Sequence, residues 1–273
     1  MNSEDFKYNY GCTSCGYRLI TKPIQKGRID VKRFIDRLDE FFDKNDMTGA
    51  GNHLDYWRGE AVSLGDLSGE LTVVSEQIGY FRKMLDEKNA TEAISRCFAL
   101  IDALENSDTV SAATVFLNAA TTLKAFGRAS ESIGLYEKAL SIYKRELFED
   151  DTRFGGLYNN YGLALADLSE YEKAEELYKK AIGIMLKSEK GKCDAAITYI
   201  NMAYLYNSDS RYGILDIEKC LSTAKQLLID EKNTKNGYYA FVLSKCAPAF
   251  RDFCDEETAI NMENEAKRIY EGT

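Results

Sequence analysis

Apolar residues recur at helical spacing along most of this 273-residue chain. Between residues 31 and 43 they stand at 31, 34, 35, 38, 41 and 42, which is the i, i+3, i+4 stripe of an amphipathic helix. Similar stripes predict helices over 71–86 and 91–104, and residues 50–57 begin the partner of the first helix. The whole pattern predicts six helical hairpins between about residue 30 and residue 271.

The sequence pattern of one hairpin occurs twice in the middle of the chain. Asn118 and Asn160 are 42 residues apart, and so are Tyr136 and Tyr178, with small residues at matching places around them. The spacing continues more weakly toward both ends. A period of this length made only of helix is typical of stacked helical arrays, which usually hold another molecule. The sequence therefore predicts an all-α repeat protein with a binding function.

The spacing of small and aromatic residues resembles the tetratricopeptide repeat. That family needs small residues at two fixed places in each hairpin, then an aromatic residue, then alanine. The matching residues are Gly162, Ala174, Tyr178 and Ala181 in one hairpin, and Ala120, Ser132, Tyr136 and Ala139 in the hairpin before it. The resemblance implies an α-α superhelix, a solenoid of about six helical hairpins whose first helices line a concave groove.

The repeat is longer than the usual length of about 34 residues. The eight extra residues of a 42-residue period amount to about two helical turns, so each helix is expected to be about one turn longer. Long repeats of this kind are similar to those of kinesin light chain and of bacterial cytoplasmic receptors for short signalling peptides.

The array is predicted to form a single domain over residues 30–273, with its strongest repeats at 110–188. The chain has only two prolines and no Ser/Gly-rich linker that would divide it. Residues 1–29 are predicted to be a loosely ordered N-terminal segment.

Composition narrows the class of partner and the location. The net charge of −9 argues against a nucleic-acid partner, because proteins that bind nucleic acid normally have a basic surface. The N-terminus is acidic and lacks the apolar core of a signal peptide, and no apolar run is long enough to cross a membrane. Seven scattered cysteines indicate a reducing compartment, so a cytoplasmic protein is expected. Nothing in the sequence indicates a homo-oligomer.

Three asparagines and a lysine recur at one place in successive first helices: Asn118, Asn160, Asn201 and Lys245. A carboxamide both donates and accepts hydrogen bonds, so a row of them can hold the backbone of an extended peptide. Peptide-binding members of the family resemble this chain in that arrangement. The alternative interpretation is structural: the asparagines bridge neighbouring helices or bond local backbone.

Other side chains are expected to face the same groove. Apolar anchors and polar groups mix there, as in peptide-binding sites. The predicted contacts are Thr121, Asn159, Leu163, Ile200, Tyr204, Phe241 and Arg251. The family's carboxylate clamp, which grips chaperone tails, needs basic residues that these positions lack, so chaperone-tail binding is not expected.

The sequence offers little for catalysis or metal binding. Cys12 and Cys15 form one CxxC pair with no second pair, and His53 is the only histidine, so a single chain cannot complete a four-ligand zinc site. Cys12 and Cys15 are the weak candidates for a metal, through a zinc ion shared across a dimer, or for a redox pair. No phosphate-binding glycine motif is present. A non-enzyme without cofactors is expected.

The leading hypothesis is therefore a peptide- or protein-binding scaffold. The alternative is a peptide-responsive regulator of a bacterial two-component pathway that acts through its N-terminal helices, residues 20–106, as in the receptors that the repeat resembles. No helix-turn-helix motif supports DNA binding.

Overall fold

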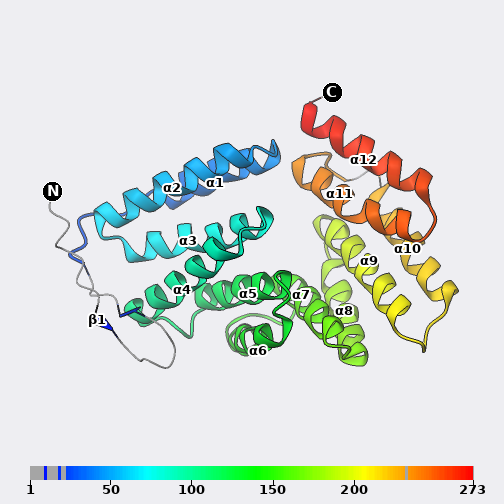
Figure 1. Cartoon of the computed structure of the whole chain (residues 1–273), viewed down its shortest axis with the longest axis horizontal. Helices are drawn as coiled ribbons and strands as arrows, with labels where there is room; N and C mark the ends of the chain where they lie inside the picture. The colour runs from blue at the N-terminus through cyan, green and yellow to red at the C-terminus, as the bar shows by residue number, and fades with distance from the viewer. Residues whose placement is uncertain (1–8, 11–17, 20–22, 231–232, 273) are drawn as a thin grey trace. The chain divides into compact units, whose positions relative to one another are not determined.

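The computed structural model describes residues 9–10, 18–19, 23–230 and 233–272. These residues form twelve α-helices, together with two two-residue strands that pair in antiparallel fashion (Figure 1). The elements are β1 (Asn9–Tyr10), β2 (Arg18–Leu19), α1 (Val31–Asp43), α2 (Met47–Leu64), α3 (Leu67–Lys83), α4 (Glu87–Leu104), α5 (Val110–Ala125), α6 (Ala129–Glu146), α7 (Arg153–Asp167), α8 (Tyr171–Met185), the 3-10 turn η1 (Glu189–Gly191), α9 (Lys192–Ser208), α10 (Ile214–Leu228), α11 (Gly237–Asp252) and α12 (Glu256–Glu271).

Consecutive helices pair into six hairpins, as the apolar pattern predicts. Aspartates start three helices in a row: Asp46, Asp66 and Asp86 each accept a hydrogen bond from the backbone N–H three residues later. Such a cap satisfies a backbone donor that has no partner inside the helix. Aspartate at these places therefore fixes where the first hairpin turns, where the second hairpin begins and where the second hairpin turns.

Residues at the repeat's small and aromatic places form the core. Tyr136 and Tyr178 are fully buried, and the small residues of both matched hairpins are buried as well. Gly162 lies against Tyr178: a Cβ atom built on it would stand 2.7 Å from Tyr178 Cε1. The small residue thus lets the second helix approach closely, and the all-α repeat fold predicted from the spacing is confirmed.

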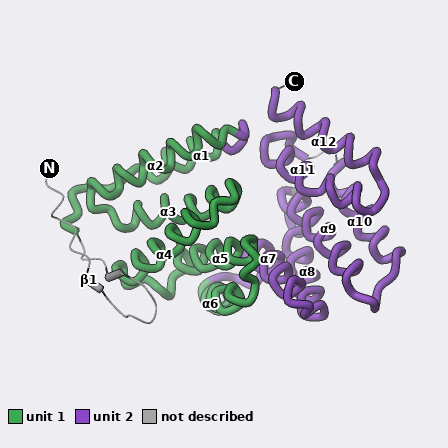
Figure 2. The backbone as a smooth tube through the Cα atoms, viewed as in Figure 1, with its two compact units in different colours: residues 1–41, 46–146 green, residues 42–45, 147–273 purple. Residues whose placement is uncertain are grey.

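Contacts between Cα atoms divide the chain into two compact units (Figure 2). Unit 1 is residues 1–41 and 46–146, and unit 2 is residues 42–45 and 147–273. Within unit 1, α3 contacts α2, α4 and α5; within unit 2, α9 contacts α7, α8, α10 and α11. Each unit is therefore a stack of hairpins with neighbours in contact. A single domain over 30–273 stays a prediction.

Asp66 binds the segment before α1 to the turn between α2 and α3. Its carboxylate is 3% exposed and accepts from the Gly69 N–H and the Ile29 N–H, both at 3.0 Å. We expect Asp66→Ala to lower the free energy of unfolding by about 2–3 kcal/mol, because it removes a cap and leaves a buried N–H unpaired. Urea denaturation measures this. Asp46→Ala, which removes only an exposed cap, should lower the free energy of unfolding by about 1 kcal/mol. If both variants lose the same stability, the hydrogen bond from the Ile29 N–H to Asp66 contributes nothing.

Candidate functional site

The first helices of the three hairpins in unit 2 are joined by side-chain hydrogen bonds. Asn201 Nδ2 on α9 donates to Asn159 Oδ1 on α7 at 2.8 Å. Tyr204 on α9 donates its hydroxyl to Asp252 on α11 at 2.6 Å, and Tyr238 on α11 donates to Asp194 on α9. These bonds place α7, α9 and α11 side by side, so their outward side chains form one surface, here called the first-helix face of unit 2.

The asparagines of this face form a chain of carboxamides. Asn201 donates to Asn159, and Asn159 Nδ2 in turn lies 3.4 Å from Asn160 Oδ1. Within the described residues, the Asn160 amide N–H groups and the Asn201 Oδ1 make no further hydrogen bond. This row of carboxamides therefore ends in a donor on α7 and an acceptor on α9, and both residues are half-buried.

In unit 1 the corresponding asparagine has a bridging role. Asn118 Nδ2 on α5 donates to Ser75 Oγ on α3 at 3.2 Å, and Ser75 is buried. Asn118 and Asn201 thus both link neighbouring first helices, which is the structural alternative that the sequence left open. A carboxamide that bridges through one N–H can still bind another group, because it carries a second donor hydrogen and an acceptor oxygen.

Aromatic side chains are exposed beside the carboxamides. Tyr204 is 37% exposed and its ring lies 5.4 Å from that of Phe253. Phe241 is half-buried, stacks with Tyr238 at 6.2 Å, and carries the exposed Lys245 ammonium 5.7 Å from its ring centre. Tyr238, 43% exposed, was not among the predicted contacts because it lies at the start of α11, outside the recurring positions.

Burial and carboxylate partners keep both tyrosines protonated. Burial raises the pKa of the Tyr204 phenol, and Asp252 raises it further. Burial also raises the pKa of Tyr238, with Asp194 as the second cause. Burial raises the pKa of Asp194 itself, against the hydrogen bond from Tyr238. The face therefore presents neutral phenols held in place by their acceptors.

Two predicted contacts have structural surroundings instead. Ile200 is 4% exposed: a helix turns 100° per residue, so with Asn201 at the surface its neighbour points into the core. Ile200 is therefore wrong as a surface anchor. Thr121 donates to the Leu117 carbonyl and accepts from the Tyr136 hydroxyl at 3.3 Å, which fixes the α5–α6 hairpin. Asn159 is buried, and its visible role is the bond from Asn201; Leu163 is half-buried.

Arg251 is engaged by the last helix. Its guanidinium pairs with Glu263 at 2.9 and 3.0 Å and with Glu256 at 3.1 Å. Those hydrogen bonds raise the pKa of Arg251 and lower that of Glu263. Glu263 stands where the repeat usually has a buried aromatic residue, so in this hairpin an exposed ion pair replaces the ring.

Two features of the described residues bear on metal binding and thiol chemistry: the grouping of possible metal ligands and the burial of cysteines. Among them no group of three or more His, Cys, Asp or Glu side chains could hold a metal ion. Burial raises the pKa of Cys193 to about 11 and that of Cys246 to about 12, which keeps both thiols protonated at neutral pH. Cys12 and Cys15 lie outside the described residues. In the part of the chain that the structure covers, no helix has the length and apolarity to cross a bilayer.

Comparison with solved structures identifies the fold. BtubC (BKLC) from P. vanneervenii aligns with 84% of this chain and 91% of its own, at a TM-score of 0.55 and 18% identity. A putative kinesin light chain from Podosopora anserina with nearly identical TPR-like repeats aligns with 73% of this chain and 94% of its own, at a TM-score of 0.50 and 14% identity. The chain has the tetratricopeptide-repeat fold. No family model matches the sequence, and no curated protein matches it. The tetratricopeptide-repeat fold is therefore visible in the backbone and in the residues that pack its hairpins, while overall sequence similarity is low.

Proposed function

We propose that this protein is a non-enzymatic interaction scaffold that holds an extended peptide segment on the first-helix face of unit 2. The observation that carries the proposal is the carboxamide chain Asn201, Asn159, Asn160, which ends in one acceptor and one pair of donors. An extended peptide backbone presents C=O and N–H groups that complement both ends. The tetratricopeptide-repeat fold supports a protein or peptide as the partner, because stacked hairpins offer extended binding surfaces.

Neighbouring side chains would contact the side chains of such a peptide. Tyr204 and Phe241 offer apolar rings, and Leu163 offers aliphatic surface. Lys245 adds a cation, whereas Arg251 is already paired with glutamates. We expect a peptide with apolar residues at alternate positions and no nucleic-acid or membrane partner. A cytoplasmic location fits this proposal, because buried free cysteines suit a reducing compartment.

Peptide selection with matched variants tests this function. Short random peptides displayed on phage would be selected on the wild-type protein, and their affinities measured by calorimetry. We expect Asn160→Ala with Lys245→Ala to weaken the selected peptides about tenfold or more, because each lost hydrogen bond to a buried partner costs about 1 kcal/mol or more. Neither residue joins α7 to α9 directly, so the fold should remain.

The matched control lies on the second helices. Lys180→Ala with Lys219→Ala removes exposed side chains from α8 and α10 and should leave the affinities unchanged. Peptides that lose affinity equally in both double variants, or in neither, would place binding away from the first-helix face. Circular dichroism of each variant would show that the helices are intact.

The regulatory alternative remains a hypothesis about α1 to α4. A truncation at residue 106 is a poor test, because residues 46–146 lie in one compact unit and the cut would remove α3 and α4 from α5. Point substitutions on α1 and α2 are the better test, since they leave the stack of unit 1 in place.

A further inference from the structure

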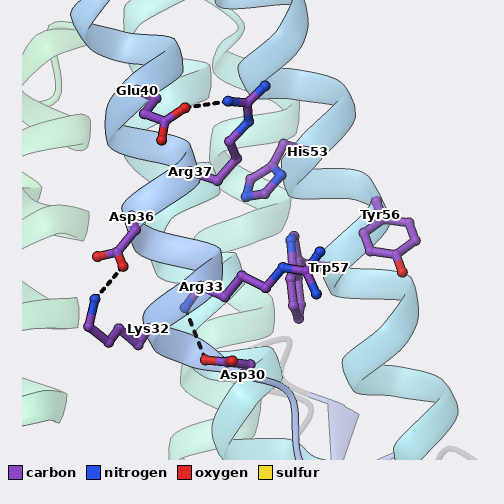
Figure 3. Close-up of a pocket in the computed structure, with 9 residues that line it drawn as sticks. All are labelled: Asp30, Lys32, Arg33, Asp36, Arg37, Glu40, His53, Tyr56 and Trp57. Atoms are coloured by element: carbon purple, nitrogen blue, oxygen red, sulfur yellow. Dashed lines mark hydrogen bonds and ion pairs between the residues drawn. The ribbon is translucent and has the colours of Figure 1, made fainter.

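A pocket opens between α1 and α2 in unit 1 (Figure 3). Its volume is about 690 Å³, within the range of ordinary ligand pockets. Helix α1 contributes a charged wall and α2 contributes a wall of rings. The residues that line it are Asp30, Lys32, Arg33, Asp36, Arg37, Glu40, His53, Tyr56 and Trp57.

Each carboxylate that lines this pocket bonds to a partner on α1. Asp36 pairs with Lys32, and Glu40 pairs with Arg37, as the dashed lines in Figure 3 show. Asp30 accepts from the backbone N–H of Arg33 at 3.0 Å and so caps the first turn of the helix. The three carboxylates that line the pocket therefore already have partners.

Three side chains of the pocket have hydrogen-bond donors without an acceptor among the described residues. Within the described residues, the Arg33 guanidinium makes no ion pair or hydrogen bond, and neither the Trp57 indole N–H nor the Tyr56 hydroxyl makes a hydrogen bond. Figure 3 shows the Arg33 side chain extending from α1 toward the rings of α2. A cation and two neutral donors thus share one pocket without bonding to any of its three carboxylates, so they can serve a carboxylate supplied by a ligand.

The rings of His53 and Trp57 pack on a buried ring behind them. His53 stacks on the buried Phe34 at 5.5 Å, and its Nε2 donates to the Phe34 carbonyl at 2.9 Å. The Trp57 ring lies 6.0 Å from Phe34 and 5.8 Å from Tyr56. Tyr56 is 60% exposed, and Trp57 is half-buried. His53 and Trp57 therefore offer apolar surface whose position is set by packing on Phe34, which lowers the entropy that a ligand would lose in ordering them.

We propose that this pocket docks an acidic segment of a partner protein, with a carboxylate on Arg33 and an adjacent aliphatic side chain against Trp57 and Tyr56. The paired carboxylates of α1 flank the site and would repel a second acidic residue placed over them, so the position of the acidic residue is specified locally. This surface lies in unit 1 and is independent of the proposed function of unit 2.

Trp57 makes the test specific, because it is the only tryptophan in the chain. The probe is the synthetic peptide acetyl-Gly-Ser-Glu-Leu-Gly-Ser-Gly-amide, which carries one acidic residue beside one aliphatic residue and contains no ring that would interfere with tryptophan emission. We expect it to change Trp57 fluorescence saturably in the full-length protein. The same peptide with glutamine for the glutamate, or with serine for the leucine, should bind about tenfold more weakly.

Arg33→Gln should weaken the acidic peptide about tenfold and remove its preference over the glutamine peptide. Arg58→Gln is the matched control: Arg58 follows Trp57 on α2, is exposed, and does not line the pocket, so this variant should bind like the wild type. An unsaturable fluorescence response would overturn the proposal, and so would equal affinity in the Arg33→Gln variant. Sedimentation that showed a dimer lost in Arg33→Gln, without peptide binding, would overturn it in favour of a second copy of the chain.

Discussion

Replacing Arg96 with methionine is expected to lower the free energy of unfolding by about 3–5 kcal/mol. Arg96 on α4 donates through Nε and Nη2 to the two carboxylate oxygens of Glu70 on α3, both at 2.7 Å. The Glu70 side chain is 3% exposed and that of Arg96 is 17% exposed. Without the arginine, a charged carboxylate would be left buried between two helices with no countercharge, which is among the costliest single changes in a protein.

Urea denaturation followed by circular dichroism measures this loss. The double variant Glu70→Leu with Arg96→Met should recover most of it, because an apolar pair of similar size removes the buried charge together with its partner. An exposed pair supplies the control: Arg128→Met breaks the Arg128–Glu131 pair on the surface and should change stability little. A single Arg96→Met variant as stable as the wild type would show that Glu70 finds water or another donor.

Much of the fold could be predicted because the repeat places small and aromatic residues at fixed intervals. The aromatic and alanine positions, such as Tyr136, Tyr178 and Ala181, are all fully buried. The helix starts were predicted less well: α3 begins at Leu67 rather than 71, and α4 at Glu87 rather than 91. Both begin directly after an aspartate cap, and the apolar stripe that located them does not extend over the first polar turn.

The candidate sites depend on contacts that sequence spacing does not contain. Recurrence of Asn118, Asn160 and Asn201 predicted that they share a position, but which hydrogen bonds they make depends on the approach of neighbouring helices. The pocket of α1 and α2 joins Arg33 to Trp57 across a turn, with no repeated signal in either helix. Its chemistry becomes visible only once the pairing of each carboxylate is known.

Replacing Gly162 with leucine is expected to lower the free energy of unfolding by about 3 kcal/mol. A Cβ atom at this position would stand 2.7 Å from Tyr178 Cε1, 2.9 Å from Tyr178 Cδ1 and 3.3 Å from the Ala174 carbonyl oxygen. Tyr178 is fully buried and cannot swing aside, so α7 and α8 would have to separate. Urea denaturation of the variant measures the cost.

Gly183→Leu is the matched control on α8. A Cβ atom there meets nothing within 4 Å, and Gly183 is exposed in the last turn of α8, so leucine should raise stability by less than about 1 kcal/mol through helix propensity. The same substitution thus changes sign between two glycines of one hairpin. Gly162→Leu combined with Tyr178→Ala tests the cause, because space vacated by the ring should make the pair less costly than the sum of the single losses. If the losses in free energy of unfolding simply add, contact with Tyr178 is not the reason why position 162 requires a small residue.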